Sequence, residues 1–143
     1  MFHNARHVFV YNQTRETFLA LRVRVADSIL SRLIGLLGKR SLAPHSGVWI
    51  FPANGIHAIG MLFIFDAVLI DKTFKVVGLR ELIRPFSVVW PASRVESVIE
   101  LPAHTISRSH TEVGDQLLIE RCEAGQAGSG PTSAGTGPKG EVR

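Results

Sequence analysis

Residues 18–25 read FLALRVRV, and this stretch decides the fold class. Arg22 and Arg24 alternate there with large apolar residues, which occupy every second position: Leu19, Leu21, Val23 and Val25. Because successive side chains of a β-strand point to opposite faces, a period of two predicts a strand with one buried face. The polar residues 12–16 connect it to a second alternating segment, residues 7–11, so the two are predicted to form a β-hairpin.

Short apolar runs bounded by turn residues predict further strands along the chain. These runs span residues 48–51, 56–61, 63–70, 75–83, 94–101 and 116–121. Roughly seven or eight short strands, without βαβ alternation, favour a sandwich or barrel over a layered α/β fold. The predicted fold class is mainly β, a single-domain β-sandwich or barrel-like fold with one short amphipathic helix.

The helix is expected directly after the hairpin. Asp27 stands where an N-cap is preferred, apolar residues recur at helical spacing between Ile29 and Leu37, and Gly38 is a typical C-terminal signal. An apolar stripe of this kind needs a surface to cover, so we expect the helix to lie across the strands as a lid.

Composition divides the chain into a folded part and a tail. The chain has 143 residues, and 45% of them are hydrophobic, which is enough for one core. From Ala124 onward it reads AGQAGSGPTSAGTGPKGEVR, where small and polar residues replace nearly every large hydrophobe. We therefore expect one β-rich domain over residues 1–123 and a disordered Gly/Ser/Pro-rich tail over residues 124–143.

Charge and cysteine content restrict the partners and the compartment. Lys and Arg number 16 against 12 Asp and Glu, a net charge of +4, but they are scattered, which predicts a solvated basic surface and disfavours nucleic acid as a partner. No apolar run reaches the length of a membrane span, and residues 1–11 lack the apolar region of a secretory signal, so we expect a soluble, cytoplasmic protein. Cys122 is the single cysteine, which excludes an internal disulfide, and a partly buried, inert thiol is expected.

The motifs of several enzyme classes are missing from the sequence. It contains no GxSxG nucleophile elbow and no GxxxxGK[ST] phosphate loop. The six histidines are dispersed and do not form the HExxH pattern of zinc proteases. The sequence therefore predicts no metal and no cofactor.

Asp66 is the most informative polar residue. It interrupts the apolar run 63–70 on the strand face that also carries Ile64, Val68 and Ile70. A buried carboxylate demands partners, which could be backbone N–H groups, a hydroxyl or an arginine: Arg32, Arg80 or Arg84. The pattern favours a structural role over catalysis, although a glycosidase-like pair with Asp71 or Glu100 stays open at this point.

Two further groups could contribute to a binding site. His57 and Met61 precede the Asp66 strand at a spacing of four, and imidazole can act as a base or a ligand near neutral pH, although a hydrogen-bonded core histidine is the commoner case. Residues 84–91 (RPFSVVWP) combine two prolines with Phe86 and Trp90. This is typical of a recognition loop, and the alternative is that both rings fold back and close one end of the fold.

Several segments resemble one known family. Residues 31–42 (SRLIGLLGKRSL) resemble the motif RxxGLMxRxxL, and four later segments resemble the motifs GmlFxFP, hTfgMxfpiDvvFlD, vLElpaG and vGD in the correct order: residues 47–52, 56–71, 99–103 and 113–115. The family is domain of unknown function 192, and the resemblance extends over about residues 20–120. It implies a largely β, sandwich-like protein of bacteria and archaea that has no agreed activity. Many relatives look secreted or linked to the cell envelope, which the N-terminus here does not support.

Three residues depart from the family motifs. Leu37 stands in place of Met, Ala58 in place of Thr, and His104 in place of Gly. The third departure puts in doubt any role that depends on a glycine conformation, because only glycine adopts a positive φ at little cost.

The residues favour a small non-enzymatic binding or accessory module that is a monomer and binds an unknown small molecule or protein. Its pocket is predicted near Trp49, His57, Asp66 and the 85–91 loop, and the other candidate binding residues are Met61, Phe86 and Trp90. The alternative is a hydrolase-like enzyme with Asp66 and His57 as an acid/base pair. An enzyme requires Asp66 to face a solvent-connected pocket, whereas an enclosed Asp66 bonded to backbone favours the module.

Overall fold

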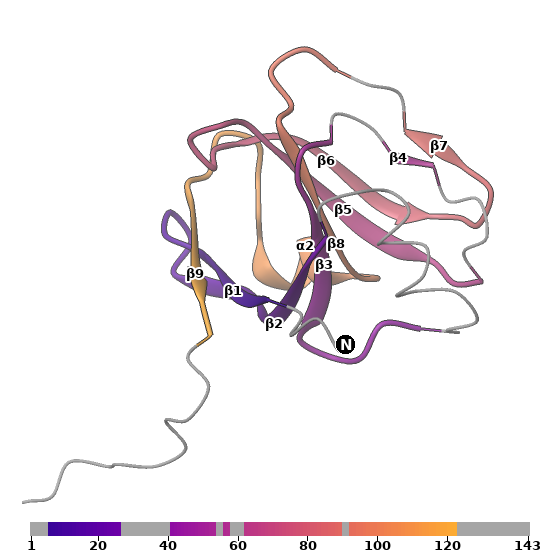
Figure 1. Ribbon diagram of the computed structural model, residues 1–143, viewed down its shortest axis with the longest axis horizontal. Coiled ribbons are helices and arrows are strands. Elements are labelled where there is room, and N and C mark those ends of the chain that lie inside the picture. The colour runs from indigo at the N-terminus through magenta and orange to yellow at the C-terminus, as the bar shows by residue number, and fades with distance from the viewer. Residues whose placement is uncertain (1–5, 27–40, 54–55, 58–61, 90–91, 123–143) are drawn as a thin grey trace, which may run out of the picture.

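A computed structural model describes residues 6–26, 41–53, 56–57, 62–89 and 92–122. Within these ranges the chain forms a seven-stranded sheet, a two-stranded ribbon and a short helix (Figure 1). The strands are β1 (His7–Asn12), β2 (Thr17–Ala26), β3 (Ser46–Ile50), β4 (Ile56–His57), β5 (Phe65–Ile70), β6 (Val76–Ile83), β7 (Val88–Val89), β8 (Ser97–Pro102) and β9 (Leu117–Arg121). The mainly β, barrel-like fold class predicted from the sequence is confirmed.

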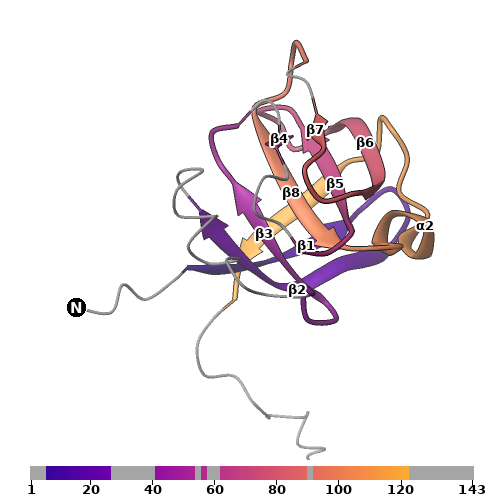
Figure 2. The ribbon, with the colours of Figure 1, turned by 90° about the vertical axis from the view of Figure 1, so that its right-hand side faces the viewer.

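The large sheet has the strand order β6-β5-β8-β3-β2-β1-β9 and curls toward a barrel (Figures 1 and 2). Its neighbouring strands are antiparallel, except that β2 and β3 run parallel. The start of β6 meets the start of β9, because Lys75 pairs with Gln116 in an isolated bridge. The N–H of Leu117 also donates to the carbonyl of Phe74, at 3.0 Å. The two end strands of the sheet are therefore joined at this point.

The strands β1 and β2 form the predicted hairpin, but one residue of the repeat lies on the other face. The register of β2 against β1 shifts between Val23 and Ala20, which marks a bulge. The N–H groups of Leu21 and Arg22 both donate to the carbonyl of His45, at 2.8 and 3.1 Å. An extra residue in a strand moves the alternation by one position. Leu21, which a strict period of two places in the core, is therefore 50% exposed.

Two apolar clusters lie on the two faces of the sheet. The barrel core fills the inside of the curl and includes Val76 and Leu117, one residue from each end strand. The loop core lies on the other face, where the sheet packs against connecting segments, and contains Phe63, Val89 and Val95. Every residue of β5 is buried, because this strand is covered on both faces. Burial on both faces explains why its sequence, FDAVLI, is apolar at every position except Asp66.

The sequence patterns do not predict the described helix, α2 (Thr105–Ser109). It follows β8 and lies against β2 and β5 (Figure 2). Its N-cap residue His104 has a φ of 70°, so histidine here adopts the left-handed conformation that the family motif reserves for glycine. A helix of five residues is too short to show an apolar repeat. The longer helix predicted after Asp27, with its lid role, and the tail predicted from Ala124 lie outside the described residues.

Candidate functional site

Asp66 is enclosed in the centre of the fold and is bonded to two backbone N–H groups. Its Oδ1 accepts the N–H of Leu82 at 3.0 Å, and its Oδ2 accepts the N–H of Ile106 at 3.0 Å. Its side chain has no exposed surface. One carboxylate from β5 therefore holds β6 and α2 in place.

Both donors of these bonds are N–H groups that regular structure leaves unpaired. The pairing of β5 with β6 is irregular between Phe65 and Ala67, and Leu82 on the opposite strand has a φ of 54°. Ile106 is the second residue of α2, and the first N–H groups of any helix lack partners within it. The sequence allowed backbone N–H groups, a hydroxyl or an arginine as partners of Asp66, and the recorded partners are two backbone N–H groups. Arg80 instead donates to the carbonyl of Leu79 at 2.8 Å.

A second fully buried carboxylate, Glu100, lies close to Asp66 in the sheet but on the other face. Asp66 is opposite Leu101, and its neighbour Ala67 is opposite Glu100. Leu101 belongs to the barrel core and Ala67 to the loop core. Because adjacent positions of a strand point to opposite faces, the two carboxylates point away from each other. Asp66 and Glu100 therefore do not form the pair of carboxylates that glycosidase chemistry requires, and this pairing, left open by the sequence, is wrong.

The other acidic candidate, Asp71, supports a turn. Its Oδ1 accepts bonds from the N–H and the hydroxyl of Thr73, at 2.8 and 2.7 Å, and from the N–H of Lys75 at 3.1 Å. The hydroxyl bond and the two N–H bonds lower the pKa of Asp71 below its ordinary value, although burial acts against them. Asp71 follows the end of β5, so it too is removed from Asp66.

Trp49 packs in a row of three aromatic rings. Its ring centroid lies 5.6 Å from that of Phe74 and 5.9 Å from that of Phe51. Its Nε1 donates to the hydroxyl of Ser97 at 2.9 Å. Trp49 packs against the barrel core, whereas Val89 of the 85–91 loop belongs to the loop core. These two parts of the predicted pocket therefore lie on opposite faces of the sheet.

His57 and the 85–91 loop come together. His57 in β4 pairs with Val88 in β7, which makes the two-stranded ribbon. Phe86 is 69% exposed and does not fold back to close the end of the fold. Met61 and Trp90, the remaining candidates, lie outside the described residues.

Exposed apolar side chains gather at the end of the fold where β5 begins and β6 ends, on the right in Figure 1. They come from the segment before β5, from the bulge of β6 and from the 85–91 loop: Leu62, Ile64, Leu82, Phe86 and Val88. We call this set the apolar end surface. Each of its members is at least 45% exposed. Sequence reasoning identified only Phe86 among them, because isolated apolar residues in loops carry no periodic signal.

A polar cluster around Asp115 was also outside the sequence-based candidates. Asp115 is buried, and its Oδ2 accepts bonds from Asn12 Nδ2 at 2.9 Å, Arg15 Nε at 3.1 Å and the Glu112 N–H at 2.9 Å. Burial raises the pKa of Asp115, but these bonds and the charge of Arg15 outweigh it and leave the pKa below its ordinary value. The cluster ties the turn after β1 to the segment before β9. We call it the Asp115 clamp.

Cys122 differs from its prediction. It is exposed, and its Sγ donates to the carbonyl of Leu21 at 3.3 Å. Among the described residues, no helix is long and apolar enough to cross a membrane. The same ranges contain no group of three or more His, Cys, Asp and Glu residues arranged to hold a metal ion.

The curled seven-stranded sheet and the enclosed, backbone-bonded Asp66 define a small barrel-like β protein with a buried structural carboxylate. The family model of DUF192, described as "Uncharacterized ACR", matches residues 10–119, and the chain belongs to this family. The assignment suggested by the motifs is thereby confirmed.

Known relatives and solved structures agree with this assignment. The chain is 28% identical over 113 residues to the UPF0127 protein PH1112 of Pyrococcus horikoshii, a match that covers 76% of this chain and 96% of the relative. A putative transcription regulator from Sinorhizobium meliloti has a similar structure, with a TM-score of 0.67, 23% identity and coverage of 83% of this chain and 96% of that one. A protein of unknown function from Novosphingobium aromaticivorans gives a TM-score of 0.66 at 15% identity, covering 78% and 83%. At these identities the two structures establish the fold alone.

Proposed function

We propose that this protein is a non-enzymatic binding module that recognises an apolar segment of a partner protein through the apolar end surface. The observation that carries the proposal is the exposure of Phe86, 69%, next to Val88 at 50%. Burying a large apolar side chain contributes roughly 1.5 to 3 kcal/mol, so a folded chain gains from covering this surface. Exposed large apolar side chains that gather at one end of a fold are typical of protein interaction sites.

Charges beside the surface indicate the chemistry of the partner. Arg80 and Arg84 are exposed on either side of Leu82, and neither forms an ion pair with a described residue. Glu81 lies between them, so the local net charge is positive. Complementary charges at the rim of an interface steer association and fix its orientation. The proposed partner segment is therefore apolar and carries acidic residues at its ends.

The enclosure of Asp66 supports a binding role over the alternative acid/base enzyme. A general acid or base must reach its substrate directly or through one water. Asp66 has no exposed surface, and each of its oxygens accepts a backbone N–H.

Selection of peptides displayed on phage tests the proposal. The full chain is the target. The Phe86→Asp, Val88→Asp double variant is used for counter-selection, so that peptides which bind outside the apolar end surface are discarded. We expect the enriched peptides to contain an apolar run with flanking acidic residues. Synthetic copies should bind at least about tenfold more weakly to Phe86→Ala, as for a central interface aromatic, and more weakly to Arg84→Glu.

Phe18→Ala is the matched control, because Phe18 is 46% exposed on β2, away from the apolar end surface. It should bind the peptides as the wild-type chain does. Peptides that bind the double variant equally well would show that this surface is not the site. Sedimentation equilibrium adds a further test: a dimer that Phe86→Ala dissociates would identify a second copy of the chain as the occupant and overturn the proposal.

A further inference from the structure

Three segments meet at the opposite end of β5 from the apolar end surface. The N–H of Glu96 donates to the carbonyl of Ile70 at 2.9 Å, and the N–H of Ala53 donates to the carbonyl of Glu96 at 2.9 Å. The ring of Trp49 contacts both Phe51 and Phe74. These contacts bring together the segment after β3, the turn after β5 and the segment before β8.

An open hollow lies between two of these segments. It has a volume of about 340 Å³ and is lined by Pro52, Ala53, Val95 and Glu96. This volume falls at the lower end of the range for small-molecule sites. Phe51 directly precedes the lining residues and is 45% exposed. An exposed aromatic ring next to a proline offers a flat apolar surface on which a planar ligand can stack.

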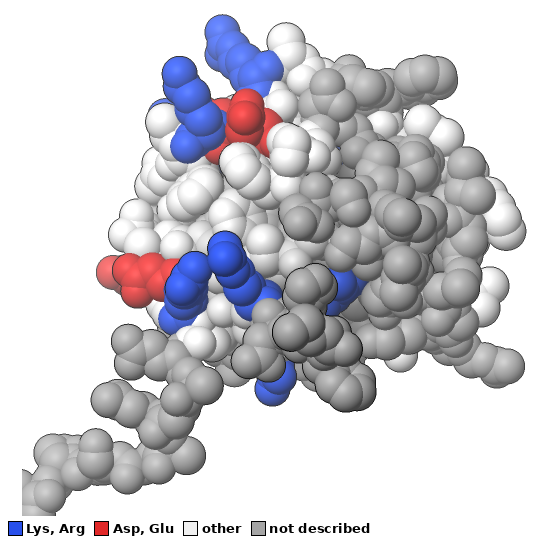
Figure 3. All heavy atoms as spheres, in the orientation of Figure 1, with Lys and Arg blue, Asp and Glu red and all other residues white. Residues whose placement is uncertain are grey.

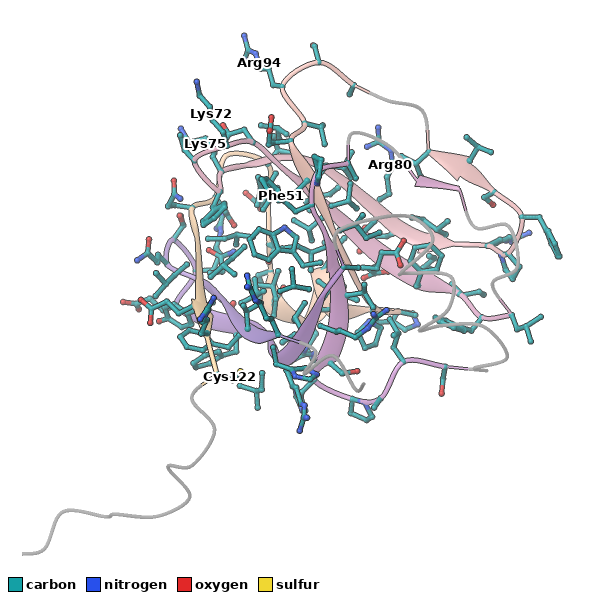
Figure 4. The ribbon with its side chains drawn as sticks, in the orientation of Figure 1. Phe51, Lys72, Lys75, Arg80, Arg94 and Cys122 are labelled. Carbon is teal, nitrogen blue, oxygen red and sulfur yellow. The ribbon has the colours of Figure 1, made fainter. Side chains whose placement is uncertain are left out.

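Three cations surround this end of the molecule. Lys72, Lys75 and Arg94 are exposed, and their side chains extend from the same end as Phe51 (Figure 4). Figure 3 shows Lys and Arg side chains there with acidic atoms between them. In the sequence, Asp71 precedes Lys72 and Glu96 follows Arg94 by two positions, so these two acids and the three cations together carry a net charge of +1. A single phosphate suits this balance better than a long polyanion, which would meet the two carboxylates.

We propose that this end of the fold binds a free nucleoside monophosphate. The base stacks on Pro52 in the hollow and on the exposed ring of Phe51 beside it. The carboxylate of Glu96 accepts hydrogen bonds from the N–H groups of the base, and Arg94 and Lys72 hold the phosphate. A carboxylate only accepts hydrogen bonds, so it selects a base edge made of donors. Guanine has such an edge, with a ring N–H beside an exocyclic amine. This site does not depend on the apolar end surface.

Calorimetric titration of the full chain at low salt tests the proposal with defined ligands. We expect guanosine monophosphate to bind, and inosine monophosphate, which lacks the exocyclic amine, to bind about tenfold more weakly, as for loss of half a bidentate contact. Ribose 5-phosphate and guanosine each lack one half of the ligand and should bind more weakly than the nucleotide. Absence of guanosine monophosphate binding at millimolar concentration would overturn the proposal. Tighter binding of a single-stranded oligonucleotide per site would also overturn it, in favour of nucleic acid.

Variants assign the binding to the named groups. Phe51→Ala should weaken binding of every nucleotide, by about 5- to 150-fold if stacking contributes as it does in single-strand binding proteins. Glu96→Gln should remove the preference for guanosine over inosine monophosphate, and Arg94→Ala should reduce the difference between the nucleotide and guanosine. Arg22→Ala is the matched control, because Arg22 is exposed on β2 opposite Ser46, at the end of β3 away from Phe51, and this variant should leave nucleotide binding unchanged. Unchanged affinity in all three site variants would show that the nucleotide binds elsewhere.

Discussion

The carboxylate of Asp66 binds the N–H of Ile106 at 3.0 Å across 40 residues of sequence. The other oxygen binds the N–H of Leu82 at 3.0 Å. Neither N–H has a partner in the regular pairing of its own element, so Asp66 replaces the hydrogen bonds that the bulge of β6 and the start of α2 lack. This relationship explains why an aspartate stands in an otherwise apolar strand.

Asp66→Ala should therefore destabilise the fold strongly. The substitution leaves two buried N–H groups without acceptors, at about 1 to 3 kcal/mol each. Asp66→Asn keeps one acceptor oxygen and should cost less. Denaturant unfolding of both variants measures the difference. Wild-type stability in both, together with lost ligand binding, would show that Asp66 belongs to a functional site.

His104→Gly should stabilise the protein by about 0.5 to 1 kcal/mol. His104 is exposed, has a φ of 70° and makes no side-chain bond to α2, so the substitution removes strain without removing a contact. Ser107→Gly serves as the control, because Ser107 is exposed within α2. This variant should destabilise the protein, since glycine is a poor helix former. Thermal unfolding of the two variants should show opposite signs. A loss of stability in both would mean that the His104 side chain contributes a contact.

Gly47→Ala should destabilise by about 1 to 3 kcal/mol through overpacking. A Cβ at Gly47 would lie 2.5 Å from the carbonyl oxygen of Glu100, so β3 and β8 would have to separate. A Cβ at Gly78 would find its closest atom at 3.5 Å, an ordinary contact, and Gly78→Ala should be neutral or slightly stabilising. Chemical denaturation compares the pair. Equal effects at both positions would contradict the close approach at Gly47.

The Asp115 clamp should make stability depend on pH in the acid range. The pKa of Asp115 in the folded chain lies below its ordinary value of 3.8. The contribution of Asp115 to the free energy of unfolding is therefore complete above pH 3.8 and is lost as the pH falls through the folded pKa. Asp115→Asn should cost about 1 to 3 kcal/mol at pH 7 and progressively less below about pH 4. Urea unfolding of both chains over this range measures the gap. A gap that stays constant down to pH 2 would show that the carboxylate charge does not matter.

The sequence supports the fold class because its signal is periodic, and it fails where one residue breaks the period. The alternation in residues 18–25 predicts β2, but the bulge moves Leu21 to the surface, and nothing in FLALRVRV marks the extra residue. The same limit applies to Asp66. Its apolar neighbours predict burial, whereas its partners are backbone groups of Leu82 and Ile106, and any residue type could supply an N–H. Five-residue α2 and the exposed loop residue Phe86 depend on tertiary packing, which a local pattern does not record.

The pairing of the first strand with the last has a consequence for synthesis of the chain. Val8 in β1 pairs with Arg121 in β9, so one edge of β1 acquires its partner only after nearly all of the folded part has left the ribosome. Contacts this distant in sequence slow folding, and an unpaired strand edge invites association with other chains. A nascent chain stalled before Leu117 would carry β1 with that edge open. Aggregation during translation should therefore be sensitive to the rate at which residues 117–121 are added.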